Sequence, residues 1–297
     1  MLSLRHWSHS ETLSVAPTTW AATRDVTRRT PGKALTVPMT EWSGEEYGQI
    51  SALQRAMAQE ALSGLAFAGD EMVVDVGCGD GFVTGALAEM VPAGFVVGVD
   101  PSRGMITAAA RGSAASASGP WFVRADARRL PFRETFDAAV SFNALHWVPE
   151  QQQALEQIAS VIRPRARALV QLVCASDRPS VEAVAMSLCH SPRWAHRFDG
   201  FAAPFVHPQP SEYEQLAARA GLTVSSLTVT DREWDFGGRD AFAHWCSVGS
   251  AAWTDRLEGG DRGRFVDDLV DSYERVSGRP GLFRFMQMRV HLIKNPT

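Results

Sequence analysis

The sequence predicts an α/β fold built around a doubly wound, mostly parallel sheet. Short apolar runs that can form buried strands alternate with amphipathic segments of helical period. This alternation is typical of parallel strands whose crossover helices cover both faces of a sheet. The first apolar run also leads directly into the glycine-rich sequence 77–81, which is suited to a tight turn between a strand and a helix.

Seven segments are expected to be strands because they are rich in apolar and β-branched residues: 72–76, 95–99, 121–123, 136–142, 168–173, 222–235 and 283–294. Helices are expected where apolar residues recur every three or four positions: from Ser51 (Leu53, Met57, Ala61, Leu65), after the glycines (Val83, Leu87, Met90), from Arg103, and around Leu155, Ile158 and Ile162. Residues 180–220 and 239–276 are predicted to be largely helical, with loops.

Composition excludes several classes of protein. The chain has 297 residues, 45% of them hydrophobic and 21% charged, and a formal net charge of −4, so it holds one large domain or two small ones and is a poor candidate for binding nucleic acid. No apolar run is long enough to span a bilayer. The four cysteines form no zinc pattern or disulfide framework, so we expect a cytoplasmic protein without a metal site.

Residues 1–38 differ from the rest of the chain. They hold many Ser, Thr and Arg residues and only two acids, Glu11 and Asp25, and they show no apolar periodicity. Such a segment is either a disordered tail, an extension upstream of a start at Met39, or a transit peptide. We therefore exclude it from the fold and assign residues 39–297 to the folded domain.

The glycine loop is the sharpest functional signal. Gly77, Gly79 and Gly81 follow a G-x-G-x-G spacing, which differs from the G-x-G-x-x-G of dinucleotide-binding loops. Asp75 precedes the loop, and a carboxylate there opposes a pyrophosphate but attracts an ammonium group. The pattern therefore favours a cationic ligand over a dinucleotide, and Cys78 is interpreted as a small residue that fits the turn.

Polar residues follow the next three strands, where the carboxyl ends of parallel strands meet. Asp100 can accept hydrogen bonds from both hydroxyls of a ribose, or it can cap the next helix. Asp126 can accept a hydrogen bond from an exocyclic amine such as that of adenine, or it can be a solvated acid beside Arg128. Asn143 follows the fourth strand.

These motifs resemble the class I S-adenosylmethionine (SAM)-dependent methyltransferases in order and spacing: 73–81, 97–100, 125–127 and 136–143. The resemblance implies a Rossmann-like sheet of seven strands whose last strand, 283–294, is antiparallel. It also implies that SAM binds and S-adenosylhomocysteine is released. The implied cofactor-binding residues are Asp75, Gly77, Cys78, Gly79 and Gly81 (methionyl part), Asp100, Pro101, Ser102 and Met105 (ribose side), Asp126 and Ala127 (adenine), and Asn143.

A narrower resemblance covers roughly residues 41–294. The segments 53–55, 144–148, 191–194 and 200–204 are similar to the group that contains trans-aconitate 2-methyltransferase and juvenile hormone acid methyltransferase, which methylate carboxylates. It implies a cofactor half at about 40–175 and a substrate-covering half at about 176–297, with helical insertions over the acceptor pocket. Residues 163–166 depart from it, because these enzymes usually have Pro-Gly-Gly there.

The acceptor is expected to contact Gln54, His146, Trp147 and Trp194. His146 is the candidate general base for a phenol or amine, although contact with the substrate or the cofactor, or a structural role, is favoured over that interpretation. A carboxylate acceptor is already ionised at neutral pH and needs no base. A lid that excludes water is expected from the aromatic residues Trp147, Trp194, Phe198, Phe201 and Phe205, whose alternative role is core packing.

The sequence therefore predicts a SAM-dependent methyltransferase that acts on a small molecule, most simply on a carboxylate oxygen. Methylation of a nitrogen, a carbon or a phenol oxygen remains an alternative. Two other classes also remain open, namely a dinucleotide-dependent oxidoreductase and a SAM-binding regulatory protein without catalysis.

Overall fold

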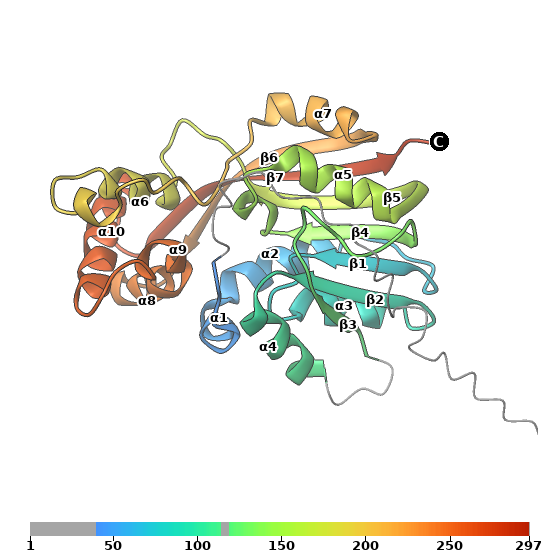
Figure 1. The fold of residues 1–297 in the computed structure, drawn as a ribbon, viewed down its shortest axis with the longest axis horizontal. Coiled ribbons are helices and arrows are strands. Elements are labelled where there is room, and N and C mark those ends of the chain that lie inside the picture. The colour runs from blue at the N-terminus through green and yellow to red at the C-terminus, as the bar shows by residue number, and fades with distance from the viewer. Residues whose placement is uncertain (1–39, 114–118, 297) are drawn as a thin grey trace, which may run out of the picture. The chain divides into compact units, whose positions relative to one another are not determined.

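A single mixed sheet organises the chain in a computed structural model that describes residues 40–113 and 119–296; the expectation for residues 1–38 lies outside this part. The strand order is β3-β2-β1-β4-β5-β7-β6 (Figure 1). β7 pairs antiparallel with both β5 and β6, and the other pairs are parallel. The strands are β1 (Met72–Val76), β2 (Phe95–Asp100), β3 (Trp121–Arg124), β4 (Phe136–Phe142), β5 (Ile162–Val173), β6 (Leu222–Asp235) and β7 (Leu282–Lys294).

All seven predicted strands and the antiparallel last strand are thus confirmed. The helices are α1 (Gly44–Ile50), α2 (Ala52–Leu62), α3 (Phe82–Met90), α4 (Arg103–Ser113), α5 (Gln151–Val161), α6 (Val181–Cys189), α7 (Pro210–Arg219), α8 (Arg239–Gly249), α9 (Ala251–Thr254) and α10 (Asp261–Ser277), with short 3-10 turns at Leu145–Trp147 and Ala195–Arg197. Two predicted helix boundaries were wrong. Leu65 lies beyond the end of α2, and Ile162 is the first residue of β5 rather than part of a helix.

Alternate side chains of each central strand enter different hydrophobic layers. Val74 and Val76 of β1 pack with α5 and α7 on one face of the sheet. Val73, the residue before Val74, points to the other face and packs with α2 and α3 there. This two-sided burial explains why the strands are apolar runs rather than alternating sequences.

The second half of the chain builds a separate helical layer. Figure 1 shows α6, α8, α9 and α10 gathered beyond the carboxyl ends of the parallel strands, around the adjoining ends of β6 and β7. Their apolar side chains form a core of their own, which includes Phe242, Trp253, Phe265 and Tyr273. No helix in the described residues is long and apolar enough to cross a membrane.

Residues 163–166, which differ from the usual Pro-Gly-Gly of the similar enzymes, include one residue with an unusual backbone conformation. Arg165 has a φ of 66°, a left-handed conformation that glycine adopts without steric penalty. It lies where the resembling enzymes usually have glycine. The turn before the core of β5 is therefore kept, although the residue that best suits it is absent.

Candidate active site

The strand order reverses between β1 and β4, and the main cavity opens at this switch point. In doubly wound sheets ligands bind outside the carboxyl ends of the strands at such a point. The cavity has a volume of about 240 Å³, and its walls come from α1, α2, the ends of β1, β2 and β4, and the C-terminal helices. A smaller cavity, lined by Asp75, Cys78 and Arg55 among others, shares Gly77 and Gly79 with it.

The glycine loop needs its glycines for different reasons. At Gly77 φ is +80°, and a Cβ would lie 2.1 Å from the Cβ of Ala144, so a side chain is excluded. At Gly79 φ is +53° and the position faces open space, as expected where a ligand approaches the backbone. Gly81 has a φ of +84° and precedes the first residue of α3. It lies beside Phe122 and Ala109 rather than on the cavity wall.

Asp100 sits at the end of β2 with both carboxylate oxygens oriented by backbone donors. Oδ1 accepts from Ser102 N at 2.9 Å, and Oδ2 accepts from Gly79 N at 3.1 Å. Burial raises the pKa of Asp100 to about 6 despite these hydrogen bonds. Ser102, not Asp100, caps α4, because its Oγ accepts from Met105 N. The capping alternative for Asp100 is therefore not supported.

Asp75 lies near the end of β1, just before the glycine loop, and is fully buried. Its Oδ2 accepts a hydrogen bond of 2.7 Å from Thr84 Oγ1, and burial raises its pKa to about 7. The same small cavity contains Arg55, which forms an ion pair of 2.8 Å with Asp80 and whose buried Nε has no protein partner. Arg55 was not predicted as a site residue. This end of the site therefore contains both the carboxyl group of Asp75 and the guanidinium group of Arg55.

Asp126 is bound by Arg128 in two ways. Its Oδ1 accepts from Arg128 N at 2.8 Å, and its Oδ2 accepts from Arg128 Nη2 at 2.6 Å. This ion pair lowers the pKa of Asp126 although burial opposes the change. Asp126 and Ala127 both line the cavity, as predicted. The carboxylate is therefore held in place by Arg128 and still borders the space where a base would lie.

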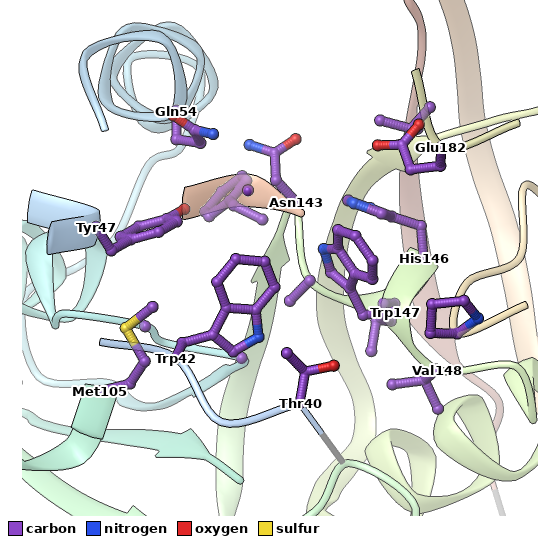
Figure 2. A pocket seen from close by; sticks show the side chains of 18 of the residues that line it. Thr40, Trp42, Tyr47, Gln54, Met105, Asn143, His146, Trp147, Val148 and Glu182 are labelled. Carbon is purple, nitrogen blue, oxygen red and sulfur yellow. The ribbon is translucent and has the colours of Figure 1, made fainter. Parts of the chain in front are cut away.

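Asn143 has a strained backbone at the end of β4. Its φ is 55°, in the left-handed region that few residues other than glycine adopt. The backbone N–H donates to Gln171 O at 2.7 Å, and the buried side-chain oxygen has no partner. Figure 2 shows the amides of Asn143 and Gln54 facing each other across the cavity. The buried Oε1 of Gln54 also has no partner.

The far wall of the cavity is aromatic. Trp147 packs edge-on against Trp42 at 5.6 Å and against Trp253 at 6.2 Å between ring centroids. Trp245, Phe283 and Phe285 complete the apolar lining. Sequence reasoning found Trp147 but missed the C-terminal aromatics, because α8, α9 and β7 lie far along the chain and carry no motif.

His146 is buried, with 5% of its surface exposed, beside the same wall. Burial, with a smaller contribution from the nearby His207, lowers its pKa to about 3. Its Nδ1 has no partner. The imidazole is therefore neutral at physiological pH and a weak proton acceptor, which argues against the general-base hypothesis.

Trp194 is not brought to the cavity. It is 3% exposed, its Nε1 donates to Asp268 Oδ2 at 2.7 Å, and its ring packs on Phe265. Phe198 and Phe201 belong to the same helical core. The predicted aromatic lid over residues 194–205 is thus largely core packing, which was the stated alternative. Ser102 likewise orients Asp100 without lining the cavity.

The predicted residues that do line the two cavities are Asp75, Gly77, Cys78, Gly79, Asp100, Pro101, Met105, Asp126, Ala127, Asn143, Gln54, His146 and Trp147. The lining residues that sequence reasoning missed include Trp42 and Tyr47, which come from the segment before α2, and Glu182 of α6. Within the described ranges, no group of three or more His, Cys, Asp or Glu side chains is arranged to hold a metal ion.

Comparison with known proteins identifies the family. A methyltransferase-domain model matches residues 73–165. The trans-aconitate 2-methyltransferase of Rhodococcus jostii is 30% identical over 192 residues, which cover 64% of this chain and 72% of that protein. The chain belongs to the class I SAM-dependent methyltransferases. Within them it falls in the group that contains trans-aconitate 2-methyltransferase.

Solved structures agree on the fold of this methyltransferase. A candidate methyltransferase from Bacillus halodurans superposes with a TM-score of 0.58 at 18% identity, covering 81% of this chain and all of that one. A phosphoethanolamine N-methyltransferase from Haemonchus contortus, solved with S-adenosylhomocysteine, gives 0.56 at 12% identity, covering 85% and 57%. The cofactor is SAM, and the residues present fit such a ligand, since open space at Gly79 lies beside the oriented carboxylate of Asp100.

Proposed function

We propose that this methyltransferase forms a methyl ester on the carboxylate of a small, largely apolar acid. The observation that carries the proposal is the set of donors in the acceptor part of the cavity. Gln54 and Asn143 present neutral amides, and Trp147 presents an indole, against an apolar wall (Figure 2). Neutral donors can hold one carboxylate without neutralising the charge that attracts it to a sulfonium.

Cationic side chains are scarce in this cavity. Among the described lining residues Arg128 is the one Arg or Lys side chain, and it is already paired with Asp126 and with Glu150 at 2.9 Å. An acid with several carboxylates, such as trans-aconitate, needs several positive partners in a buried site. The proposal is therefore a monocarboxylate, in contrast to the acceptor named for the Rhodococcus relative.

The cofactor roles follow the geometry of the loop. We propose that Asp100 accepts from the ribose hydroxyls and that Asp126 and Ala127 border the adenine. Asp75 and Arg55 are proposed to meet the ammonium and carboxylate of the methionyl part. Residues 40–175 would then form the cofactor half of the domain and residues 176–297 the cover of the acceptor.

The chain acts by alignment in this proposal. Bound SAM supplies an electrophilic methyl group on a positively charged sulfur. Gln54, Asn143 and Trp147 orient the acceptor oxygen, and such positioning can contribute on the order of 7–11 kcal/mol. The aromatic wall excludes water, which strengthens the attraction between opposite charges. His146 is neutral and a weak base at neutral pH, and a carboxylate acceptor requires no base.

The test uses SAM with a labelled methyl group and a panel of arylalkanoic acids, phenols and amines. Mild alkali releases the label of a methyl ester as volatile methanol, and this release is the expected result. The alternatives, a nitrogen, carbon or phenol-oxygen acceptor, predict label that stays fixed. The His146→Ala variant should keep ester formation within about tenfold, whereas loss of a general base typically costs 10²–10⁴-fold.

Gln54 provides a matched pair of variants on one helix. Gln54→Ala should lower kcat/KM for the acid by about 10-fold or more, because a buried hydrogen bond to a charged group is lost. Gln59→Ala changes the same residue type on the exposed side of α2 and should have no effect. Equal activity of both variants would contradict the proposed clamp.

We also propose that the protein works in a reducing compartment such as the cytoplasm. All four cysteines, Cys78, Cys174, Cys189 and Cys246, are free and buried. Burial raises the pKa of Cys174 to about 11 and of Cys189 to about 12, so these thiols are unreactive. Thiol labelling of the protein extracted from its native cells under acid quench should find no disulfide.

A further inference from the structure

A buried carboxylate faces the acceptor cavity and has no role in the proposed transfer. Glu182, in the first turn of α6, is 8% exposed and lines the cavity. Figure 2 shows it across the cavity from Tyr47 and Met105.

No fixed cation balances this charge. Within the described residues, the one ion-pair partner of Glu182 is His207, whose Nε2 lies 3.7 Å from Oε2, beyond hydrogen-bond distance. That Nε2 has no hydrogen-bond partner, and burial lowers the pKa of His207, although Glu182 opposes the change. Tyr273 is also near, but its hydroxyl already donates to Arg284 O at 2.7 Å. A buried carboxylate whose one ion-pair partner is an imidazole beyond hydrogen-bond distance is poorly compensated, so a cationic ligand would be favoured here.

The surroundings are those of a cation site. The ring of His207 packs at a tilt against Phe205, with 4.7 Å between ring centroids. Phe205 lies 6.2 Å from Trp253, and Trp253 lies 6.2 Å from Trp147, again between ring centroids. Trp245 lines the same cavity, and its buried Nε1 has no partner. Aromatic faces attract cations through their quadrupole, and the attraction grows when water is excluded.

We propose that Glu182 and the cavity-lining rings of Trp245 and Trp253 form a subsite for a protonated amine on the acceptor. The inference deepens the proposed function, since it gives the acceptor two ends. The carboxylate end lies at Gln54, Asn143 and Trp147, and the ammonium end lies at Glu182. The substrate class is an amino acid in the broad sense, with an apolar or aromatic spacer between amine and carboxylate.

The experiment measures binding without turnover. The protein is first saturated with S-adenosylhomocysteine, which prevents amines from occupying the cofactor side. It is then titrated calorimetrically at pH 7.5 with phenylalkylamines of increasing chain length and with the matching phenylalkyl alcohols. The best amine should bind about tenfold tighter than its alcohol. If no amine binds tighter than its alcohol, the subsite is refuted.

Substitutions test whether Glu182 causes the preference for amines over alcohols. Glu182→Gln should abolish the preference for amines while leaving the alcohols bound as before, and Glu182→Asp should retain part of it. Glu214→Gln removes an exposed charge from α7 and is the matched control. An unchanged preference in Glu182→Gln would overturn the assignment to Glu182. Because the ligands carry no carboxylate, this result is independent of whether the enzyme forms methyl esters.

Discussion

The backbone N–H of Gly79 donates a hydrogen bond to Oδ2 of Asp100 across 3.1 Å, so the glycine loop and the end of β2 are joined directly. The loop turns tightly after β1, where Gly77 N and Cys78 N also donate to Val99 O. Asp100 is thereby oriented by the element that its proposed ligand must also contact. Its role in binding and its role in shaping the loop can be separated by substitution.

Asp100→Ala should weaken binding of S-adenosylhomocysteine by about 100-fold, because two hydrogen bonds to a charged acceptor are lost. Isothermal titration calorimetry measures this directly. Asp70→Asn, an exposed acid before β1, serves as the control and should bind like the wild type. Near-normal affinity of the Asp100 variant would refute the ribose assignment.

Cofactor affinity should also depend on pH through Asp100. Its pKa is raised to about 6 by burial, and the ionised form is the better acceptor for two hydroxyls. Affinity should therefore be high at pH 8 and fall as the pH decreases through about 6. In Asp100→Asn the part of this fall that lies near pH 6 should disappear. An identical pH profile in both proteins would contradict the prediction.

Asp75 should make the stability of the ligand-free protein fall as the pH rises, whereas Asp100 should make cofactor affinity rise with pH. Its folded pKa of about 7 lies above the ordinary value of 3.8, so the folded state binds the proton more tightly than the unfolded state. Its contribution to stability is complete below about pH 4 and is lost as the pH rises through 7. Asp75→Asn should then be more stable than the wild type at pH 8, on the order of 1–3 kcal/mol.

Urea unfolding at pH 5 and pH 8 tests this difference. The advantage of Asp75→Asn should shrink at pH 5, where the wild-type carboxyl is already protonated. Thr84 Oγ1 can still donate to the new amide oxygen, so the hydrogen bond at this position is kept. A variant that is less stable than the wild type at pH 8 would show that the buried charge is compensated.

The fold was predictable because its signals are local. Each strand is a continuous apolar or β-branched run, and Gly77–Gly81 marks the one turn that must be tight. The residues proposed to bind the cofactor share this advantage, since they follow strands in sequence order. By contrast α1, with Tyr47, carries no periodic pattern over its seven residues, and its packing beside the site comes from tertiary contacts.

The acceptor side was harder to predict for a physical reason. Glu182 lies in α6 and Trp253 lies in α9, which are far apart in the sequence. These helices pack around the ends of β6 and β7 that continue past the pairing of β7 with β5. Trp194 resembles a lid residue in sequence, yet its N–H is bound by Asp268 of α10. An aromatic residue in a helical segment is compatible with a core and with a cavity wall, and only the packing of distant elements distinguishes them.

Arg165→Gly should stabilise the protein by about 1 kcal/mol, because an L residue in the left-handed region is strained and glycine is not. The exposed Arg165 side chain has no hydrogen bond or ion pair among the described residues, so little is lost with it. Arg167→Gly is the control at a position of ordinary φ. It should be destabilising, since its guanidinium donates to Ala66 O. Chemical unfolding of the two variants should show opposite signs.

The segment before α1 should define the shortest active form of the chain. Glu41 Oε1 accepts from Gly104 N at 2.6 Å and from Ser102 Oγ at 2.9 Å. Trp42 then lies against Trp147, with 5.6 Å between ring centroids. At Gly104 a Cβ would lie 2.2 Å from Trp42 O, so the segment is seated closely on the start of α4.

A chain that starts at Met39 should therefore keep full activity, and one that starts at Gly44 should lose about tenfold or more in kcat/KM, since the wall around the reacting groups is opened to water. In the full-length protein Trp42→Ala should reproduce most of this loss, whereas Trp42→Phe should restore the edge contact with Trp147 and much of the activity. Initial rates with a saturating acceptor, together with thermal unfolding, measure the effect. Loss of activity in a folded Met39 form would instead show that residues 1–38 contribute to catalysis.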